Sequence, residues 1–150
     1  MSWRNITEAD VLTKISGAEL SGYRKAVLAG GQADPVQPSI DLVTAKVRGF
    51  VAGNSANTLS SDAAQIPDRL IGAAVALIII EIMSRVAGKI IDPEGARRKD
   101  ADEANRLLRD VAAGHFSIND PVSGRENTGG GASVVGRRAP RVNRQNLQGT

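Results

Sequence analysis

The sequence predicts an all-α fold, a bundle of about five helices around a central apolar helix, followed by an extended C-terminal arm. Its 150 residues allow one domain of ordinary size. Hydrophobic residues make up 41% of the chain and aromatic residues only 3%, so aliphatic side chains supply nearly all of the apolar mass and favour helix-on-helix packing. Apolar residues recur at the helical period through residues 1–120, whereas residues 121–150 hold only a handful of branched aliphatics.

Capping patterns predict the first two helices. Residues 7–10 (TEAD) place a hydroxyl three positions before an acid, so a short helix starts there. Residues 16–19 (SGAE) repeat the pattern, and an apolar stripe follows as far as Gly30. We therefore expect a second helix over residues 17–29.

A loop, a third helix and a second loop follow. Residues 30–38 contain two Gly and two Pro and are predicted to form a linker. The period of the apolar residues from Ile40 to Val51 predicts an amphipathic third helix. Residues 53–64 (GNSANTLSSDAA) are small and polar, which is typical of an exposed loop, and long loops of this kind often contact partners. The candidate partner-binding residues in this loop are Asn54, Asn57, Thr58 and Leu59.

The most apolar part of the chain predicts a central helix. Pro67 suits its first turn, and the run 70–83 is apolar nearly all round. This run could instead be a surface that a partner buries, but a five-helix domain needs a central apolar element, and we assign the run to the core. Its uncharged part, residues 70–80, would rise about 16 Å, roughly half of a bilayer core, so we expect no membrane partner. Glu81 and Arg85 stand four apart in the favourable order for an ion pair.

A fifth helix is predicted to start at Asp92-Pro93 and to end at Gly114. Five of its residues are expected to face inward, namely Ala101, Ala104, Leu107, Leu108 and Val111. Asp100, Asp102 and Glu103 stand beside three basic residues, so they are interpreted as a solvated face and not as a metal site. His115, just after the helix, is expected to have a capping or surface role.

Residues 121–150 are predicted to form a flexible Gly/Arg-rich arm. They contain five Arg and one Glu and thus carry a charge of +4, which leaves −1 for the first 120 residues of a chain whose net charge is +3. Such a segment cannot bury a core of its own. The arm could bind a protein surface, contact nucleic-acid phosphates or remain a solvated tail, and its apolar residues favour protein. Its candidate partner-binding residues are Val134, Val135, Arg137, Arg138, Arg141, Val142, Arg144 and Leu147.

The sequence offers no constellation typical of a catalytic or metal site. The chain has no Cys and one His, which excludes a disulfide, a thiolate zinc site, a cysteine nucleophile and a paired-histidine metal centre. No nucleophile stands in a motif with a base and an orienting group. We therefore expect no enzymatic activity and no cofactor.

Four segments within residues 6–118 mark the predicted helices in order along the chain. Residues 6–11 (ITEADV) open the first helix, residues 39–52 form most of the third, residues 66–70 (IPDRL) precede the central one, and residues 102–118 (DEANRLLRDVAAGHFSI) end the fifth. Their order and spacing resemble the head-tail connector (adaptor) proteins of tailed phages, in the Mu-like branch. In those proteins an opening T-x-x-D-L helix is followed by A-x-x-x-I-x-x-Y, by P-x-x-L before the central helix, and by an ending similar to LLRDIAAGK.

This resemblance implies a structural virion protein, located in the neck at the capsid vertex and made in the host cytoplasm. Such adaptors form a ring, usually of twelve copies, beneath the portal, where the ring extends the DNA channel and docks the next neck or tail protein. The implied partners are thus the chain itself, the portal protein, a downstream neck or tail protein, and DNA that passes without sequence readout. Residues 1–120 would be the adaptor domain. The family's aromatic-rich loop is not found in residues 54–64, and the arm is not part of the shared pattern.

A small helical DNA-binding protein is the alternative. Residues 7–28 could form two helices joined by a tight turn at residues 15–17, with the second acting as a recognition helix. That helix offers only Arg24 and Lys25 for contact with DNA.

Overall fold

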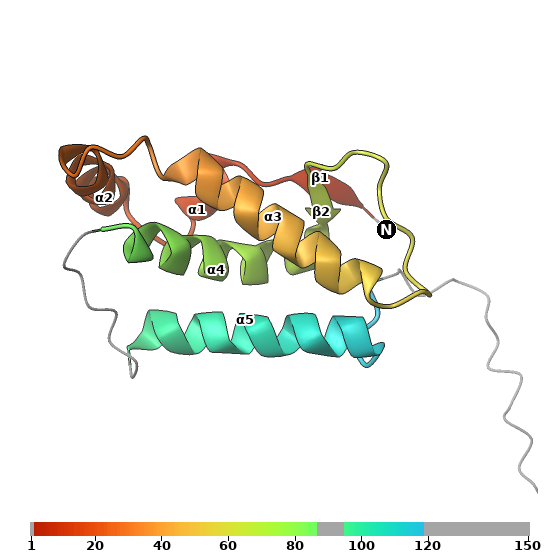
Figure 1. The fold of residues 1–150 in the computed structure, drawn as a ribbon. Coiled ribbons are helices and arrows are strands. Elements are labelled where there is room, and N and C mark those ends of the chain that lie inside the picture. The colour runs from red at the N-terminus through yellow and green to blue at the C-terminus, as the bar shows by residue number, and fades with distance from the viewer. Residues whose placement is uncertain (1, 87–94, 119–150) are drawn as a thin grey trace, which may run out of the picture. The chain divides into compact units, whose positions relative to one another are not determined.

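The structure, a computed structural model, describes residues 2–86 and 95–118. The predicted all-α fold is confirmed, since these residues are mostly helical (Figure 1). Two short strands and one 3₁₀ turn accompany five α-helices within this part of the chain. In chain order the elements are β1 (Trp3–Asn5), α1 (Glu8–Val11), α2 (Gly17–Ala29), α3 (Val36–Ala52), β2 (Gln65–Pro67), η1 (Asp68–Leu70), α4 (Ile71–Ser84) and α5 (Ala96–Ala113).

Helix α4 is the central element of the bundle. It packs against both α3 and α5, and α1 also contacts it (Figure 1). Nine of its fourteen residues are buried, which is why its sequence is apolar on every side. Ile78 and Ile82 are fully buried at its centre. The apolar run thus lies in the core, as predicted.

Helix α5 presents a narrow apolar face to α4 and α3. Ala101, Ala104, Leu108 and Val111 are buried, and Leu107 is half-buried at the edge of this face. The helix ends at Gly114, whose φ of 80° lies in the left-handed region that glycine adopts most readily. The predicted inward face and the predicted stop are both confirmed, whereas the predicted start at residues 92–93 lies outside the described residues.

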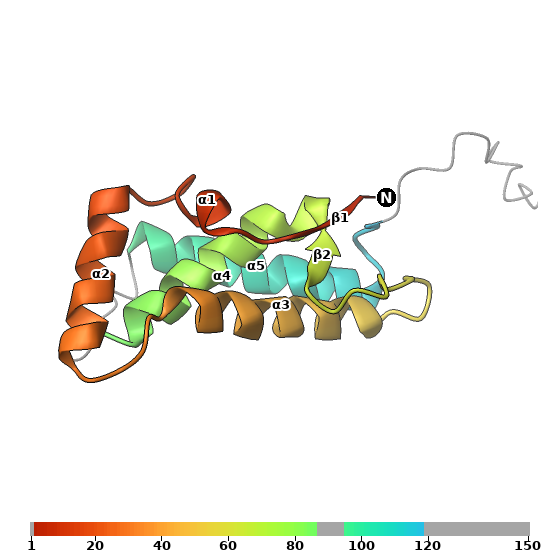
Figure 2. The same ribbon diagram turned by 90° about the horizontal axis from the view of Figure 1, so that it is seen from above.

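Helix α2 lies across one end of the three long helices (Figure 2). The Oγ of Ser16 accepts a hydrogen bond from the backbone N–H of Glu19 (3.2 Å), and this cap starts the helix where the sequence predicts it. Leu20, Tyr23 and Val27 form its buried side. The opposite side of the helix is exposed, with 53% of Leu28 accessible to solvent.

Three details differ from the sequence predictions. Strand β1 pairs antiparallel with β2, an interaction between segments about 60 residues apart that the sequence did not indicate. The predicted linker 30–38 is shorter, because α3 already begins at Val36 and includes Pro38. Proline is tolerated there, since N–H groups in the first helical turn have no intrahelical partner. Pro67 ends β2, and α4 begins only at Ile71.

None of the helices in the described part of the chain has both the length and the apolar character needed to cross a membrane.

Candidate partner-binding surfaces

The loop between α3 and β2 is held by Arg48 on α3. Its Nη1 donates to the carbonyls of Asp62 (2.9 Å) and Gln65 (2.8 Å), and its Nη2 donates to the carbonyl of Ser60 (2.9 Å). The guanidinium carbon also lies 5.8 Å from the centre of the Trp3 ring, within cation–π range. One side chain therefore gives the loop its shape and joins it to β1.

Two of the four predicted loop residues stabilise the loop itself. Asn57 donates through Nδ2 to a backbone carbonyl at the end of α3 (3.1 Å). The Oδ1 of Asn54 accepts from the backbone N–H two residues later (3.0 Å), an Asx turn. Thr58 and Leu59 are exposed. Within the loop these two are the predicted residues that a partner can reach, and their partner role stays a prediction.

The predicted partner-binding residues of the arm, from Val134 to Leu147, lie outside the described residues.

A cluster of charged residues attaches α2 to the rest of the bundle. Arg97 on α5 pairs with Glu19 on α2, with Nη2 2.7 Å from Oε2, and its Nη1 donates to the hydroxyl of Tyr23 (3.0 Å). On the other side of α2, Arg24 makes a bidentate pair with Glu8 (2.6 and 2.8 Å) and a second pair with Asp34 (3.0 Å). The sequence did not reveal these contacts, because the partners are far apart in the chain.

These pairs shift the ionisation of their members toward the charged forms. The hydrogen bonds from Arg24 lower the pKa of Glu8, and the bond from the Val36 backbone N–H, followed by Arg24, lowers the pKa of Asp34. The hydrogen bonds to Glu19 raise the pKa of Arg97. Ion pairs thus join both sides of α2 to neighbouring elements, in addition to the packing of its buried apolar side chains.

A groove between α4 and α5 has an acidic rim. Its floor consists of small or aliphatic residues, Gly72, Ala73 and Ala76 from α4 and Ala104 and Leu107 from α5, and its volume is about 290 Å³. Asp100, Glu103 and Asp110 stand along its α5 side, Arg106 lies beside them, and Lys14 approaches from the turn before α2. We call this surface the acidic groove.

A second groove lies between α3 and α5 and has more basic residues. Helix α4 contributes Leu77, Ile80 and Glu81 to this groove. Its walls carry Leu42, Lys46 and Phe50 on α3 and Arg98, Asp102, Asn105 and Arg109 on α5. We call this surface the basic groove.

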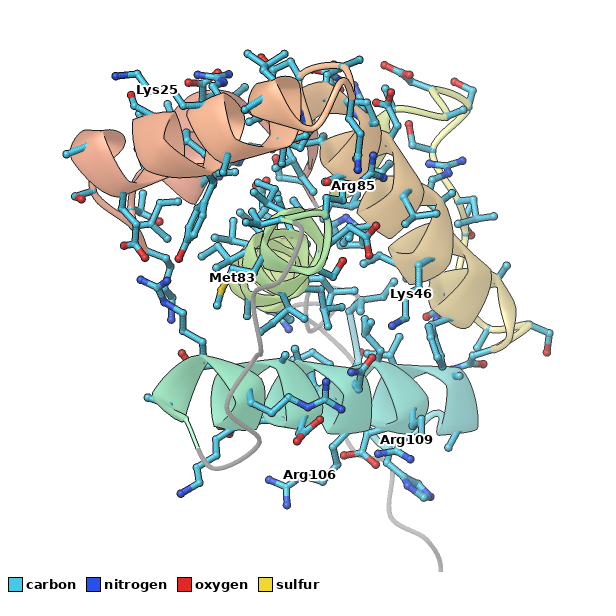
Figure 3. All side chains as sticks on the ribbon, turned by 60° about the vertical axis from the view of Figure 1, so that its left-hand side comes forward. Lys25, Lys46, Met83, Arg85, Arg106 and Arg109 are labelled. Carbon is cyan, nitrogen blue, oxygen red and sulfur yellow. The ribbon has the colours of Figure 1, made fainter. Side chains whose placement is uncertain are left out.

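Lys46 crosses the basic groove. Figure 3 shows it extending from α3 toward α5, where its Nζ donates to the Oδ1 of Asn105 (2.8 Å). Arg98 pairs with Asp102 on the same wall (3.4 Å). Leu42 lies at the edge of the groove with 52% of its surface exposed, which is a large fraction for a leucine. The groove thus combines apolar surface with a small excess of positive charge.

The described residues contain no group of His, Asp and Glu arranged to hold a metal ion. His115 is exposed, and its Nδ1 lies 3.9 Å from a carboxylate oxygen of Asp110. Asp100, Asp102 and Glu103 are exposed on α5, in agreement with the predicted solvated face.

Comparisons with protein families, with curated proteins and with solved structures find no match for this chain.

Proposed function

We propose that this protein is a structural subunit of a phage head-tail connector, an adaptor that forms a ring beneath the portal, extends the DNA channel and docks the next neck or tail protein. The proposal rests on the resemblance of four segments to adaptors of Mu-like phages. In the structure each of these segments occupies a distinct position in the helical domain.

The first and third segments form the starts of helices. Thr7 and Asp10 make a capping box at the start of α1, in which Asp10 accepts from the backbone N–H (2.8 Å) and the hydroxyl (2.9 Å) of Thr7. Ile66 and Leu70 of the third segment are fully buried where β2 passes into α4. Thr7, Asp10 and Leu70 thus have structural roles at places where the adaptor pattern has the same residue types.

The second and fourth segments line the core. Residues 39–52 form most of α3, whose inner side includes Val43 and Val47. In the fourth segment Leu108 is fully buried, and Ile118 returns to the core after the turn at Gly114. The four segments therefore belong to one packed unit, which supports treating them as a single pattern.

The surfaces of the domain also support an assembly role. The two grooves lie along different sides of α5 and have different chemistry. Leu12, Leu28, Leu42 and Leu59 are exposed on separate elements. A subunit that is enclosed by neighbours needs contact surfaces on more than one side.

The DNA-binding alternative receives less support from the geometry. Arg24, one of the two basic residues on the would-be recognition helix, is engaged by Glu8 and Asp34. Helix α1 is only four residues long, which is short for the first helix of a helix-turn-helix unit.

The test is to mix the purified protein with its cognate portal protein and to examine the mixture by negative-stain microscopy and by mass measurement. We expect a ring of many copies stacked on the portal. The same protein incubated with duplex DNA is the comparison. A single copy or an isolated pair on the portal, or a discrete dimer bound to DNA, would contradict the connector assignment.

A further inference from the structure

We propose that neighbouring copies of this chain join side to side, with the acidic groove of one copy packed against the basic groove of the next. The inference rests on the proposed function for the ring, and it names the two surfaces that meet within it.

The two grooves face different directions because of the angular positions of residues on α5. Successive residues of an α-helix are rotated by about 100°, so Asp100, Glu103 and Asp110 fall on one side of the apolar face. Arg98 and Arg109 fall on the other side. In agreement with this, the first set borders the groove beside α4 and the second set borders the groove beside α3.

The charges of the two grooves are complementary in sum. Three carboxylates outnumber two cations in the acidic groove (Asp100, Glu103 and Asp110 against Lys14 and Arg106), and three cations outnumber two carboxylates in the basic groove (Lys46, Arg98 and Arg109 against Glu81 and Asp102). Within residues 2–86 and 95–118, neither Asp100 nor Glu103 forms an ion pair, and neither does Arg109. Arg98 and Asp102 of the basic groove already neutralise each other. Two carboxylates on one side and Arg109 on the other thus have no ion-pair partner among the described residues and can meet across a contact between copies. Opposite charges of this kind set the orientation of an interface.

The apolar parts of the two grooves are also complementary. Leu42 projects at the edge of the basic groove, where Ile80 and Phe50 are half-buried. The floor of the acidic groove is lined by Gly72, Ala73 and Ala76, whose small side chains leave space for a larger one. Leu42 of one copy would enter this space. The contact would then have an apolar centre and a charged rim, as protein interfaces commonly have.

A contact between two unlike surfaces is head-to-tail. An open chain of subunits then has one unused groove at each end, so the assembly continues until it closes into a ring. A two-fold dimer would instead place the same surface of both copies in contact.

Engineered cysteines distinguish these arrangements, because the natural chain contains no Cys. Glu103→Cys and Arg109→Cys place one thiol on each side of α5, and both positions are exposed. Six residues apart on one helix, their Cα atoms are about 10 Å from each other, too far for a disulfide within the chain. Any disulfide therefore joins two copies. The variants are oxidised alone and together with the portal, and the products are separated on non-reducing gels.

We expect the double variant to give a ladder of dimers, trimers and larger products. A mixture of the two single variants should give dimers only, and each single variant alone should remain monomeric. Lys25→Cys combined with Arg109→Cys is the control, since Lys25 lies on α2 away from both grooves (Figure 3). Strong dimerisation of Glu103→Cys alone would show a two-fold contact and overturn the proposal, as would the absence of a ladder both with and without portal.

Charge reversal provides a second measurement. Glu103→Arg and Arg109→Glu should each weaken self-association about tenfold, whereas the two changes in one chain should largely restore it. If self-association of the double variant is as weak as that of the single variants, the proposed pairing of the two grooves is wrong. If the ladder forms but no ring appears on the portal, the groove contact stands and the connector assignment fails. If a ring appears on the portal but no ladder forms, the connector assignment stands and the groove contact fails.

Discussion

Arg48 is the residue on which the conformation of the α3–β2 loop depends. Because its guanidinium binds three loop carbonyls at once, its removal breaks three hydrogen bonds that hold the loop. We expect Arg48→Ala to lower the free energy of unfolding by about 1 to 3 kcal/mol. We also expect faster amide exchange in residues 53–64, measured by hydrogen-deuterium exchange.

The matched control for this change is Lys25→Ala, which removes an exposed basic side chain from α2. It should alter the free energy of unfolding by no more than about 0.5 kcal/mol. If the loop exchanges at the wild-type rate in Arg48→Ala, then Arg48 does not determine the conformation of the loop.

Asp10, in the capping box of α1, is expected to contribute to the pH dependence of the unfolding free energy. Hydrogen bonds from Arg4 (2.8 and 3.0 Å), followed by those from Thr7, lower its pKa to about 2. Since the pKa in the folded state lies below the usual value of about 3.9, the carboxylate stabilises the fold above that value. This stabilisation is lost as the pH falls toward 2. Asp10→Asn should therefore flatten the pH dependence of the unfolding free energy between about pH 4 and pH 2.

Urea unfolding at a series of pH values measures this effect in both proteins. At neutral pH, Asp10→Asn should also cost about 1 kcal/mol through the weakened cap. Parallel pH profiles for the two proteins would show that Asp10 has no role in the acid sensitivity.

At the scale of elements, α4 is the helix that tolerates charge least. Ile79 is 4% exposed within the core cluster, so Ile79→Asp places a carboxylate among apolar side chains with little access to water. An unpaired buried charge costs several kcal/mol, enough to unfold a domain of this size. We expect loss of the helical circular dichroism signal or a greatly lowered melting temperature.

Leu28→Asp makes the same chemical change at a leucine that is 53% exposed on α2. It should leave the melting temperature nearly unchanged. Normal folding of Ile79→Asp would mean that α4 is not the centre of the core.

Helix α2 is joined to α5 by the ion pair between Glu19 and Arg97. Removing either member of the Arg97–Glu19 pair releases the same contact, so Arg97→Gln and Glu19→Gln should not be additive. Because both side chains are about one-third exposed, we expect a coupling of only about 1 kcal/mol. Amide exchange in α2 should accelerate in each variant, and exchange in α4 should not. Additive effects would exclude a direct interaction between the two residues.

Elements with local signals at their ends were predictable from the sequence. Helix α2 starts at the Ser16 cap and ends before Gly30, and α5 ends at Gly114, because these residues favour caps by their own chemistry. The β1–β2 pair was not predictable, since each strand has only three residues and its partner is distant in the chain. The role of Arg97 was missed for the same reason, as Glu19 lies 78 residues away.

The loop residues show a different limit of sequence reasoning. Small polar residues are common in exposed loops, and their side chains also stabilise loops through hydrogen bonds to the backbone. The residue type alone therefore does not tell whether a loop residue binds a partner or a neighbouring part of its own loop. Asn54 and Asn57 belong to the internal set. The tendency of Asn to form Asx turns was the one signal in the sequence for the internal role of Asn54. The grooves were not predictable, because each is formed by residues of at least two helices.

At the scale of the whole molecule, the bundle provides a rigid body with unlike sides. Helices α3, α4 and α5 pack on one another, so the two grooves are fixed in orientation by the same core. In a closed ring the angle between the two contact surfaces of a subunit determines how many copies complete the circle. In the ring that we propose, the orientation of the two grooves on this core would therefore set the number of copies.

Deleting residues 121–150 tests whether the arm contributes to the proposed assembly separately from the folding of the helical domain. The described core packs together residues from Ile6 to Ile118, and the deleted residues have too few apolar side chains to contribute a core of their own. The truncated chain should therefore keep its helical circular dichroism spectrum and its melting temperature. If the protein is the connector that we propose, its incorporation into phage heads should weaken, because five Arg and several aliphatic side chains that could bind a partner are removed.

The measurements are the amount of truncated protein in purified particles and the infectivity of these particles. The comparison proteins are the full chain and a variant in which only the five Arg of the arm are changed to Gln. If the Arg variant behaves like the truncation, the contacts of the arm are chiefly electrostatic, and if it behaves like the full chain, apolar side chains such as Val134 and Leu147 dominate. Heads that incorporate the truncated protein normally and remain infectious would show that the arm is dispensable and that the grooves of residues 1–120 are sufficient for assembly.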